Sequence, residues 1–238
     1  MNKHLLSPRF VFQGVFFFAS LLLLAACTNP KKDLKPKVGM INGHDYVDLD
    51  LPSGLLWATC NVEAPQPSNN GGYYAWGETS IKEDYSYKTL KYWSVERKYF
   101  LKYVTDDSEG FVDNRETLLA PDDAATMNWG IGWRTPTHAE WKELVNKRNC
   151  KWTWTMQNGK PGYLVTSKRN GNSIFLPAAG FFYDSDHLQD ACERGCYWSS
   201  TLKSSSSVWN CYFGPSFYNA DSAAARYSGQ SIRPVATP

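Results

Sequence analysis

The sequence has no excess of charge of either sign. Its 238 residues hold 25 basic and 23 acidic side chains, and beyond residue 26, after Lys3 and Arg9, the two counts are equal. No stretch is rich in lysine and arginine of the kind that neutralises phosphates, so nucleic-acid binding is disfavoured. With 42% apolar and 20% charged residues, the composition is that of a globular protein and excludes a disordered tail or a fibre.

The common local signatures of catalysis are also missing. The sequence contains no Gly-x-Ser-x-Gly, His-Glu-x-x-His, phosphate-binding loop or dinucleotide-binding glycine pattern. Three histidines lie beyond residue 26, and none stands in a recognisable arrangement with a nucleophile. They are His44, His138 and His187. We therefore predict that the protein is not an enzyme.

One long apolar run, from Phe10 to Ala26, follows Lys3 and Arg9 and ends in Leu24-Ala25-Ala26-Cys27. The run is shorter than the ~20 residues that a membrane-spanning helix needs, which favours a cleaved secretory signal over the alternative, an N-terminal membrane anchor. The final tetrapeptide resembles the lipobox of bacterial lipoproteins. That resemblance implies that residues 1–26 are a lipoprotein signal peptide. It also implies that Cys27 becomes the first mature residue and carries a diacylglycerol that holds the protein on a membrane.

The segment after Cys27 has the composition of a linker. Residues 28–37 hold two prolines and four lysines, with Leu34 as the one large apolar side chain. Such a segment cannot bury enough surface to offset the entropy lost on ordering, so we predict a flexible lipidated tether over residues 27–38. The expected location is the outer membrane of a bacterial cell envelope. Because no acidic run follows Cys27, the choice between the periplasmic face and the cell surface stays open.

Six cysteines are present, and five remain for the body once Cys27 is lipidated. Five thiols cannot all pair, and a domain of this length can fold on a hydrophobic core alone, so disulfides are optional and their pairing stays open. A zinc site built from His187, Cys192 and Cys196 would lack a clear fourth ligand. The five cysteines are Cys60, Cys150, Cys192, Cys196 and Cys211.

Local sequence signals predict two helices. The capping box Thr137-x-x-Glu140 predicts a helix that runs to about Arg148, and Pro121 in a first turn predicts a shorter one that reaches Met127.

Turn residues divide the rest of the body into strand-sized pieces. Ala64 to Gly72 is expected to be a loop, and the pairs Asn158-Gly159 and Asn170-Gly171 predict tight turns. Two short helices with a twisted, mainly antiparallel sheet and long loops would make an α+β fold in a single domain over residues 39–238. Strands are predicted at residues 151–155, 162–167, 173–176, 197–201, 208–213 and 231–235.

Seven motifs follow one another through the body, and they are Asp123-Ala124-Ala125-Thr126-Met127-Asn128-Trp129-Gly130, Trp133-Arg134-Thr135-Pro136-Thr137, Glu140-Trp141, Trp152-Thr153-Trp154, Gly171-Asn172-Ser173-Ile174-Phe175-Leu176-Pro177-Ala178-Ala179-Gly180, Tyr197-Trp198-Ser199-Ser200 and Gly229-Gln230-Ser231-Ile232-Arg233-Pro234-Val235. Their order resembles that of the Fibrobacter succinogenes major paralogous domain, over nearly all of the exported body. The resemblance implies a C-type-lectin-like fold, distantly similar to the formylglycine-generating sulfatase modifiers, on a secreted or lipid-anchored bacterial protein.

Most residues of these motifs are expected to be structural. The guanidinium groups of Arg134 and Arg233 are suited to binding loop carbonyls or carboxylates in buried or half-buried positions. Each large aromatic side chain buries ~150–250 Å² in a loop-rich domain, and this places the tryptophans in the core. The tryptophans concerned are Trp133, Trp141, Trp152, Trp154 and Trp198.

The enzymatic activity of the sulfatase modifiers does not carry over to this chain. Those enzymes resemble the chain in fold but bind copper through two cysteines in the C-terminal part of the domain. Here Cys211 is the one cysteine after Cys196, and no cysteine lies between Arg226 and Val235. An enzyme is therefore the least favoured class of function.

Calcium is the cofactor for which the sequence offers a pattern. Four acidic residues after Thr105 fall where oxygen ligands stand in an EF-hand loop, with Gly110 at the turn. Position 1 is Thr105 rather than aspartate, so a solvated acidic loop is the favoured alternative and no cofactor is expected. The four acidic residues are Asp107, Glu109, Asp113 and Glu116.

These features together predict a lipid-anchored, non-catalytic binding module of the cell envelope that recognises a glycan or an envelope protein through its loops. The alternative is a structural or assembly component that acts through lateral protein contacts. Aromatic rings that flank polar turns are the candidate ligand contacts, because an exposed ring can stack on a sugar. These residues are Tyr183, Trp209, Tyr212, Phe217 and Tyr218.

Overall fold

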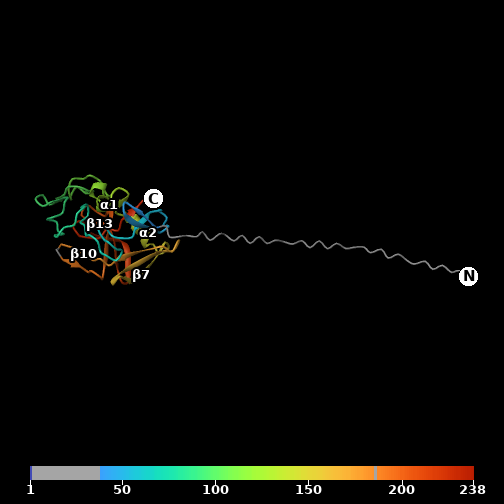
Figure 1. The fold of residues 1–238 in the computed structure, drawn as a ribbon. Coiled ribbons are helices and arrows are strands. Elements are labelled where there is room, and N and C mark those ends of the chain that lie inside the picture. Colours follow the sequence, from blue (N-terminus) through green and yellow to red (C-terminus); the bar gives the residue numbers. More distant parts are fainter. Residues whose placement is uncertain (2–37, 185–186) are drawn as a thin grey trace. The chain divides into compact units, whose positions relative to one another are not determined.

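The computed structural model describes Met1, residues 38–184 and residues 187–238 (Figure 1). The predicted signal peptide, the lipidation site Cys27 and the tether lie outside these residues, apart from Met1 and Val38. No helix in the described ranges is both long enough and apolar enough to cross a membrane.

Strands dominate the fold. They hold 39% of the described residues, whereas helices hold 8%, and the strands form five separate sheets. The α+β class and the C-type-lectin-like arrangement expected from the sequence are therefore wrong, and the body is mostly β. The expectation failed because the two helices carry clear end signals but are short, while several strands have no marked pattern in the sequence.

The largest sheet has the strand order β1-β2-β3-β15-β6. The turn between β1 and β2 uses Asn42 (φ 50°) and Gly43 (φ 83°), the backbone conformation that Asn-Gly hairpin turns require. Because β15 pairs with both β3 and β6, the end of the chain lies between segments from the first and middle parts of the sequence. The strands are β1 (Val38–Ile41), β2 (His44–Asp48), β3 (Leu56–Ala58), β6 (Trp133–Arg134) and β15 (Val235–Ala236).

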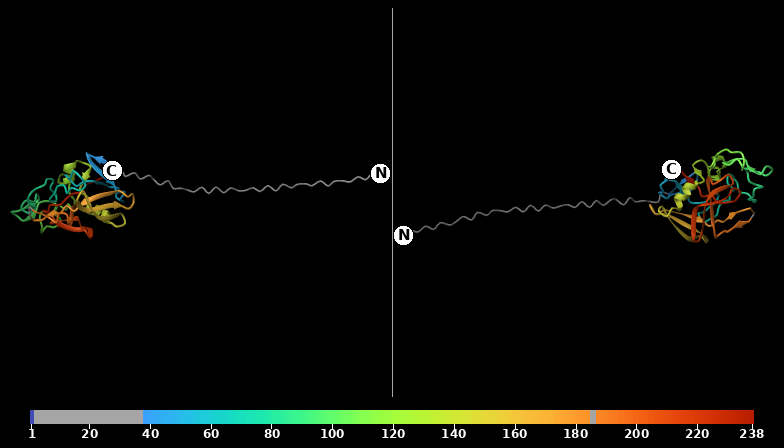
Figure 2. Two further views of the ribbon diagram at one scale, coloured as in Figure 1. Left: turned by 60° about the horizontal axis from the view of Figure 1, so that its bottom comes forward. Right: turned by 180° about the vertical axis from the view of Figure 1, so that it is seen from behind.

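Two antiparallel three-stranded sheets hold the longest strands (Figure 2). They pack against each other through aromatic rings. The predicted Asn158-Gly159 turn joins the first two strands of one sheet, and Gln157 pairs with Lys160 across it. One sheet contains β7 (Cys150–Gln157), β8 (Lys160–Ser167) and β9 (Ser173–Pro177), and the other contains β12 (Gly195–Leu202), β13 (Ser207–Gly214) and β14 (Phe217–Ala225). Two short ribbons pair β4 (Trp93–Ser94) with β5 (Tyr99–Phe100), and β10 (Phe181–Phe182) with β11 (Leu188–Gln189).

Strand β14 was not predicted from the sequence. Its residues Asn219 and Asp221 and its three consecutive alanines have low strand propensity. Pairing with β13 from Ser207↔Ala225 to Gly214↔Phe217 makes the segment a strand nonetheless, because tertiary contacts override local preference. Phe217 and Tyr218 therefore lie in a paired strand rather than on a loop.

The helix signals are confirmed locally. In α2 (His138–Val145) the Thr137 hydroxyl accepts the Glu140 N–H and the Glu140 carboxylate accepts the Thr137 N–H, which is the predicted capping box. The helix ends three residues earlier than predicted, because the Asn146 side chain accepts the Arg148 N–H and offers the backbone a turn instead. The shorter predicted helix corresponds to a 3-10 turn, η1 (Ala120–Asp122), followed by α1 (Ala124–Trp129).

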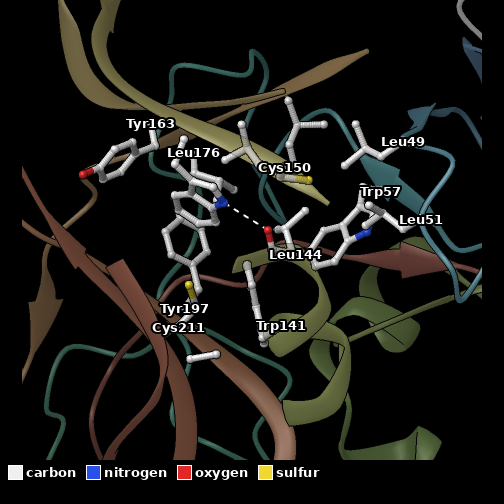
Figure 3. Close-up of a cluster of buried hydrophobic side chains, with 14 of the residues drawn as sticks. Leu49, Leu51, Trp57, Trp141, Leu144, Cys150, Tyr163, Leu176, Tyr197 and Cys211 are labelled. Atoms are coloured by element: carbon white, nitrogen blue, oxygen red, sulfur yellow. Dashed lines mark hydrogen bonds between the residues drawn. The ribbon is translucent and has the colours of Figure 1, made fainter. Parts of the chain in front are cut away.

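Helix α2 supplies the centre of the main hydrophobic cluster. Trp141 and Leu144 project from it toward Trp57, Leu176 and Tyr197 (Figure 3). Four of the five predicted core tryptophans are buried: Trp133, Trp141, Trp152 and Trp198. The fifth, Trp154, is half-buried and packs against the main hydrophobic cluster. Their indole N–H groups donate to backbone carbonyls, so no polar cost offsets the burial.

Arg233 is fully buried and has backbone oxygens as most of its partners. Its guanidinium donates to the carbonyls of Ala58, Thr59 and Phe175 at 3.1, 2.7 and 2.9 Å, and to the Asn61 side chain at 2.9 Å. Within the described ranges it forms no ion pair with a carboxylate. Burial lowers its pKa from the ordinary value. The predicted structural role of Arg233 is confirmed: it joins the end of β3 to β9.

Replacing Arg233 with methionine should strongly destabilise the protein. The substitution keeps much of the side-chain volume but removes the donors that Arg233 supplies to three carbonyl oxygens and the Asn61 amide oxygen, at a cost of about 3 kcal/mol or more in the free energy of unfolding. Urea unfolding followed by tryptophan fluorescence measures this. The control Arg148→Met removes an exposed guanidinium and should stay within about 0.5 kcal/mol of the parent. Equal effects of the two substitutions would contradict the role of Arg233.

Candidate functional site

A polar pocket of about 380 Å³ lies beside the loop that follows β3. The loop supplies most of the lining, and the β7–β8 turn supplies Lys160. The Asn158 amide donates to the Ser68 hydroxyl at 3.3 Å, which holds that turn against the loop. The volume falls in the range of ordinary small-ligand sites. The lining residues are Glu63, Asn69, Asn70, Gly71, Gly72, Ile81 and Lys160.

Two glycines allow the loop to close around the pocket. Gly71 has φ 72°, and a Cβ there would lie 2.3 Å from the Val62 carbonyl oxygen. At Gly72 a Cβ would lie 2.6 Å from Glu63 Oε2 and 2.9 Å from the Tyr74 hydroxyl. Glu63 itself has φ 61°, an uncommon conformation for a residue other than glycine. The backbone therefore brings the Glu63 carboxylate, which lines the pocket, close to the buried Tyr74 hydroxyl.

Several polar groups at the pocket have no partner within the protein. Glu63 and Lys160 form no ion pair with any described residue. The side-chain amide of Asn69 makes no hydrogen bond to a described residue. Tyr74 is 1% exposed, and its hydroxyl lies beside the Glu63 carboxylate. Burial, and then the nearby Glu63 carboxylate, raises the pKa of Tyr74 well above its ordinary value. Glu63 and Lys160 are exposed and Asn69 is half-buried, so their unpaired groups are accessible to a polar ligand.

A larger groove of about 580 Å³ beside Trp133 has a different character. Its charged groups are already paired: Arg134 binds the two Glu140 oxygens at 2.7 and 2.6 Å, and Asp123 accepts hydrogen bonds from Ala125 and Thr135. Because these charges stabilise the ends of α1 and α2, they are not free to bind a ligand. The polar pocket is therefore the candidate site.

The predicted ligand contacts do not gather in one place. Trp209 lies on β13, where the His138 ring stacks parallel to its ring at 4.3 Å and the Lys203 ammonium lies 4.9 Å from its centre. His138 also pairs with Asp221 at 2.9 Å. These neighbours occupy the ring surface that a stacked sugar would need.

Three other predicted contacts belong to the hairpin of β13 and β14. Tyr218 stacks on Trp152 at 4.7 Å and packs against the main hydrophobic cluster. Tyr212 and Phe217 contact each other at 5.2 Å, and the Arg194 guanidinium lies 5.1 Å from the centre of the Phe217 ring. None of the three lines the polar pocket.

Tyr183 differs from the other predicted contacts because it is 47% exposed. Its ring lies 5.4 Å from that of Tyr227, and its residue neighbour Phe182 contacts Tyr73 at 5.1 Å. Tyr73 in turn accepts a hydrogen bond from the pocket residue Asn70 at 3.0 Å. Tyr183 thus belongs to an aromatic surface that reaches the edge of the pocket.

The four acidic residues of the predicted calcium loop do not converge. Asp113 accepts hydrogen bonds from the N–H groups of Tyr103 and Val104 and pairs with Arg115 at 2.9 Å. Glu109 accepts from Ser206, while Asp107 and Glu116 are exposed. Across the part of the chain that the structure describes, no group of three or more histidine, cysteine or acidic side chains is placed to hold a metal ion. This applies to His187, Cys192 and Cys196 as well.

The five cysteines of the body are free thiols in the structure. Cys150, Cys196 and Cys211 are buried, Cys60 is half-buried and Cys192 is exposed. Burial raises the pKa of Cys150 to about 11 and also raises those of Cys196 and Cys211.

The pocket residues were not identified from the sequence. The composition of residues 64–72 indicated a loop, but nothing in it pointed to Glu63 or Asn69 as ligand contacts, and Lys160 follows an ordinary Asn-Gly turn. The available signal was the pair Gly71-Gly72, which marks a close approach of the backbone to its neighbours.

Comparison with known proteins gives one match. The profile of a protein family described as a domain of unknown function, DUF8237, matches residues 154–235, from within β7 to the first residue of β15. The match includes Lys160 of the pocket and Arg233, but not Glu63 or Asn69. No curated protein and no solved structure matches the chain.

The stability contributed by Asp113 should depend on pH. Burial alone would raise its pKa, but the N–H groups of Val104, Tyr103 and Arg115 and the Arg115 guanidinium lower it to about 2, from 3.8. Asp113 therefore stabilises the fold above pH 4, and this contribution is lost as pH falls toward 2. The Asp113→Asn variant should be about 2 kcal/mol less stable than the parent at pH 6.

Urea unfolding at pH 6, 4 and 2.5 checks this, and the difference between the two proteins should shrink at each step. The control Asp107→Asn changes an exposed carboxylate of the same loop that makes no hydrogen bond to a described residue, and it should follow the parent within about 0.5 kcal/mol. A difference at Asp113 that stays constant with pH would show that its charge is not the cause.

Proposed function

We propose that the body from residue 39 is a non-catalytic binding domain and that it takes a glycan in the polar pocket. The observation that carries the proposal is the set of polar groups at the pocket wall that no described residue pairs: the Glu63 carboxylate, the side-chain amide of Asn69 and the Lys160 ammonium. A ligand rich in hydroxyl groups supplies both donors and acceptors to such a wall.

The three groups differ in what they offer to a sugar. A carboxylate accepts hydrogen bonds from hydroxyl groups, an ammonium donates them, and an amide does both. Ile81, which is 58% exposed, adds an apolar surface for the C–H face of a sugar ring. Apolar surface with a few placed polar groups is the usual composition of a small-ligand site.

The pocket's composition supports binding rather than catalysis. Glycoside hydrolysis in most families requires two carboxyl groups about 5–10 Å apart, and Glu63 is the one carboxylate among the described lining residues. The lining includes no histidine, cysteine, serine or threonine to act as a base or nucleophile.

We also propose that the protein is a lipoprotein of the bacterial outer membrane. This part rests on the sequence alone, on the apolar run that ends in Leu24-Ala25-Ala26-Cys27 and on the resemblance of the body to the Fibrobacter succinogenes major paralogous domain. Acylation at Cys27 would keep the binding domain at the membrane, with the tether giving it reach.

Glycan binding is tested by screening the detergent-solubilised full-length protein on a glycan array, followed by calorimetry with the best-bound glycan. Glu63→Gln should weaken binding at least tenfold, because a hydrogen bond to a charged group contributes about 1.5–3 kcal/mol. Asn69→Ala should weaken it less. The control Glu116→Gln removes an exposed carboxylate outside the pocket and should bind as the parent does.

Two results would overturn this function. One is the absence of any bound glycan at high protein concentration. The other is binding that survives both pocket substitutions. A stoichiometric protein neighbour captured by cross-linking on intact cells, together with no glycan binding, would favour the assembly role instead.

Lipidation is tested with Cys27→Ser. The parent should partition into the membrane fraction and its mature N-terminal peptide should carry the mass of an acylated cysteine, because several acyl chains bind a bilayer almost irreversibly. The variant should lose that mass. A parent protein with an unmodified N-terminus that is recovered in the soluble fraction would exclude the lipoprotein assignment.

A further inference from the structure

A row of aromatic rings begins at the edge of the polar pocket. Tyr73 is the first ring, and its hydroxyl accepts the amide of the pocket residue Asn70 at 3.0 Å and donates to the Ala179 carbonyl at 2.5 Å. Its ring meets Phe182 edge-on at 5.1 Å. The residue after Phe182 in the sequence, Tyr183, is the next ring.

The row continues away from the pocket through rings of other segments. Tyr183 contacts Tyr227 at 5.4 Å, Tyr227 contacts Tyr87 at 4.5 Å, and Tyr87 contacts Trp93 at 4.6 Å. The aromatic row, as we use the term, comprises Tyr73, Phe182, Tyr183, Tyr227, Tyr87 and Trp93.

These rings differ from the rings of the main core in exposure. Trp57, Trp141 and Tyr197 are 1% exposed or less, whereas Tyr183 is 47% exposed and four of the other five rings in the row are half-buried. Tyr227 alone is covered, at 6% exposure. Five of the six rings pack in one hydrophobic cluster with Tyr85 and Phe100, and the parts that they leave exposed are the apolar surface available to a ligand.

The backbone beneath the row is fixed by pairing between distant segments. Phe182 and Gly229 exchange hydrogen bonds at 2.9 and 3.0 Å, and Tyr74 pairs with Gln230. A Cβ at Gly229 would lie 2.7 Å from the Tyr85 ring, so aromatic packing reaches the backbone itself. A surface fixed in this way binds without first having to be ordered.

We propose that the ligand is a glycan chain of several sugar units, with one unit in the polar pocket and the following units stacked along the aromatic row. The inference rests on the proposed function of the pocket. A single sugar would leave the row unused, whereas a chain that leaves the pocket at Tyr73 meets the row at once. Tyrosine and tryptophan rings combine an apolar face with a polar edge, which matches the C–H faces and hydroxyl rims of successive sugars.

The test measures affinity against chain length. Full-length protein in detergent is titrated by calorimetry with the monosaccharide, disaccharide, tetrasaccharide and hexasaccharide of the sugar type bound best on the array. The β-1,4-linked series of glucose, xylose and N-acetylglucosamine are included in every case. The parent should bind the hexasaccharide at least tenfold more tightly than the monosaccharide.

Tyr183→Ala and Trp93→Ala should reduce the affinity for the hexasaccharide about tenfold and leave that for the monosaccharide unchanged. Glu63→Gln should weaken the binding of every length. The matched control Trp209→Ala removes a half-buried ring outside the row and should preserve the length dependence. Thermal unfolding shows whether each variant is folded. Because Tyr183 is the most exposed ring of the row, Tyr183→Ala should disturb folding least.

The two proposals fail in different ways. Affinity that is the same for all lengths, or length dependence that survives Tyr183→Ala and Trp93→Ala, would overturn the chain proposal while sensitivity to Glu63→Gln still supports the pocket. No binding at any length would overturn the function of the pocket and the chain proposal with it.

Discussion

The guanidinium of Arg233 is the interaction on which the rest of the body depends. It is buried without a carboxylate partner among the described residues and satisfies oxygens from two parts of the chain, the end of β3 and strand β9. One of its acceptors is Asn61, whose amide in turn donates to the Asn70 carbonyl at 2.8 Å. The next residue, Val62, donates to Ile232. A single buried cation thus fixes both ends of the loop that forms the polar pocket.

The pocket and the aromatic row share this support. The segment 229–233 carries Arg233, pairs with Tyr74 and Phe182, and lies beside the loop with Gly71. The groups that hold this segment are satisfied by internal hydrogen bonds, whereas Glu63 and Lys160 at the pocket form no ion pair with a described residue. The charged groups around α2 are paired, and those at the pocket are not. The position in which this loop is held accounts for the difference.

The sequence predicts the features whose cause is local. The capping box of α2, the Asn158-Gly159 turn and the burial of large indoles each follow from a few adjacent residues or from a strong preference of one side chain. Strand β14 and the pocket could not be predicted in this way. The first depends on pairing with β13, and the second brings Glu63 and Lys160 together from segments that only tertiary contacts make neighbours.

The state of the cysteines bears on how the domain can be handled. None of the five thiols in the described residues is engaged in a cross-link, and the three most deeply placed are held in their protonated, unreactive form. Among the described cysteines, thiol-directed labels should reach Cys192 first, since it is exposed and Cys60 is half-buried, and this gives the body a preferred attachment point for a spectroscopic probe.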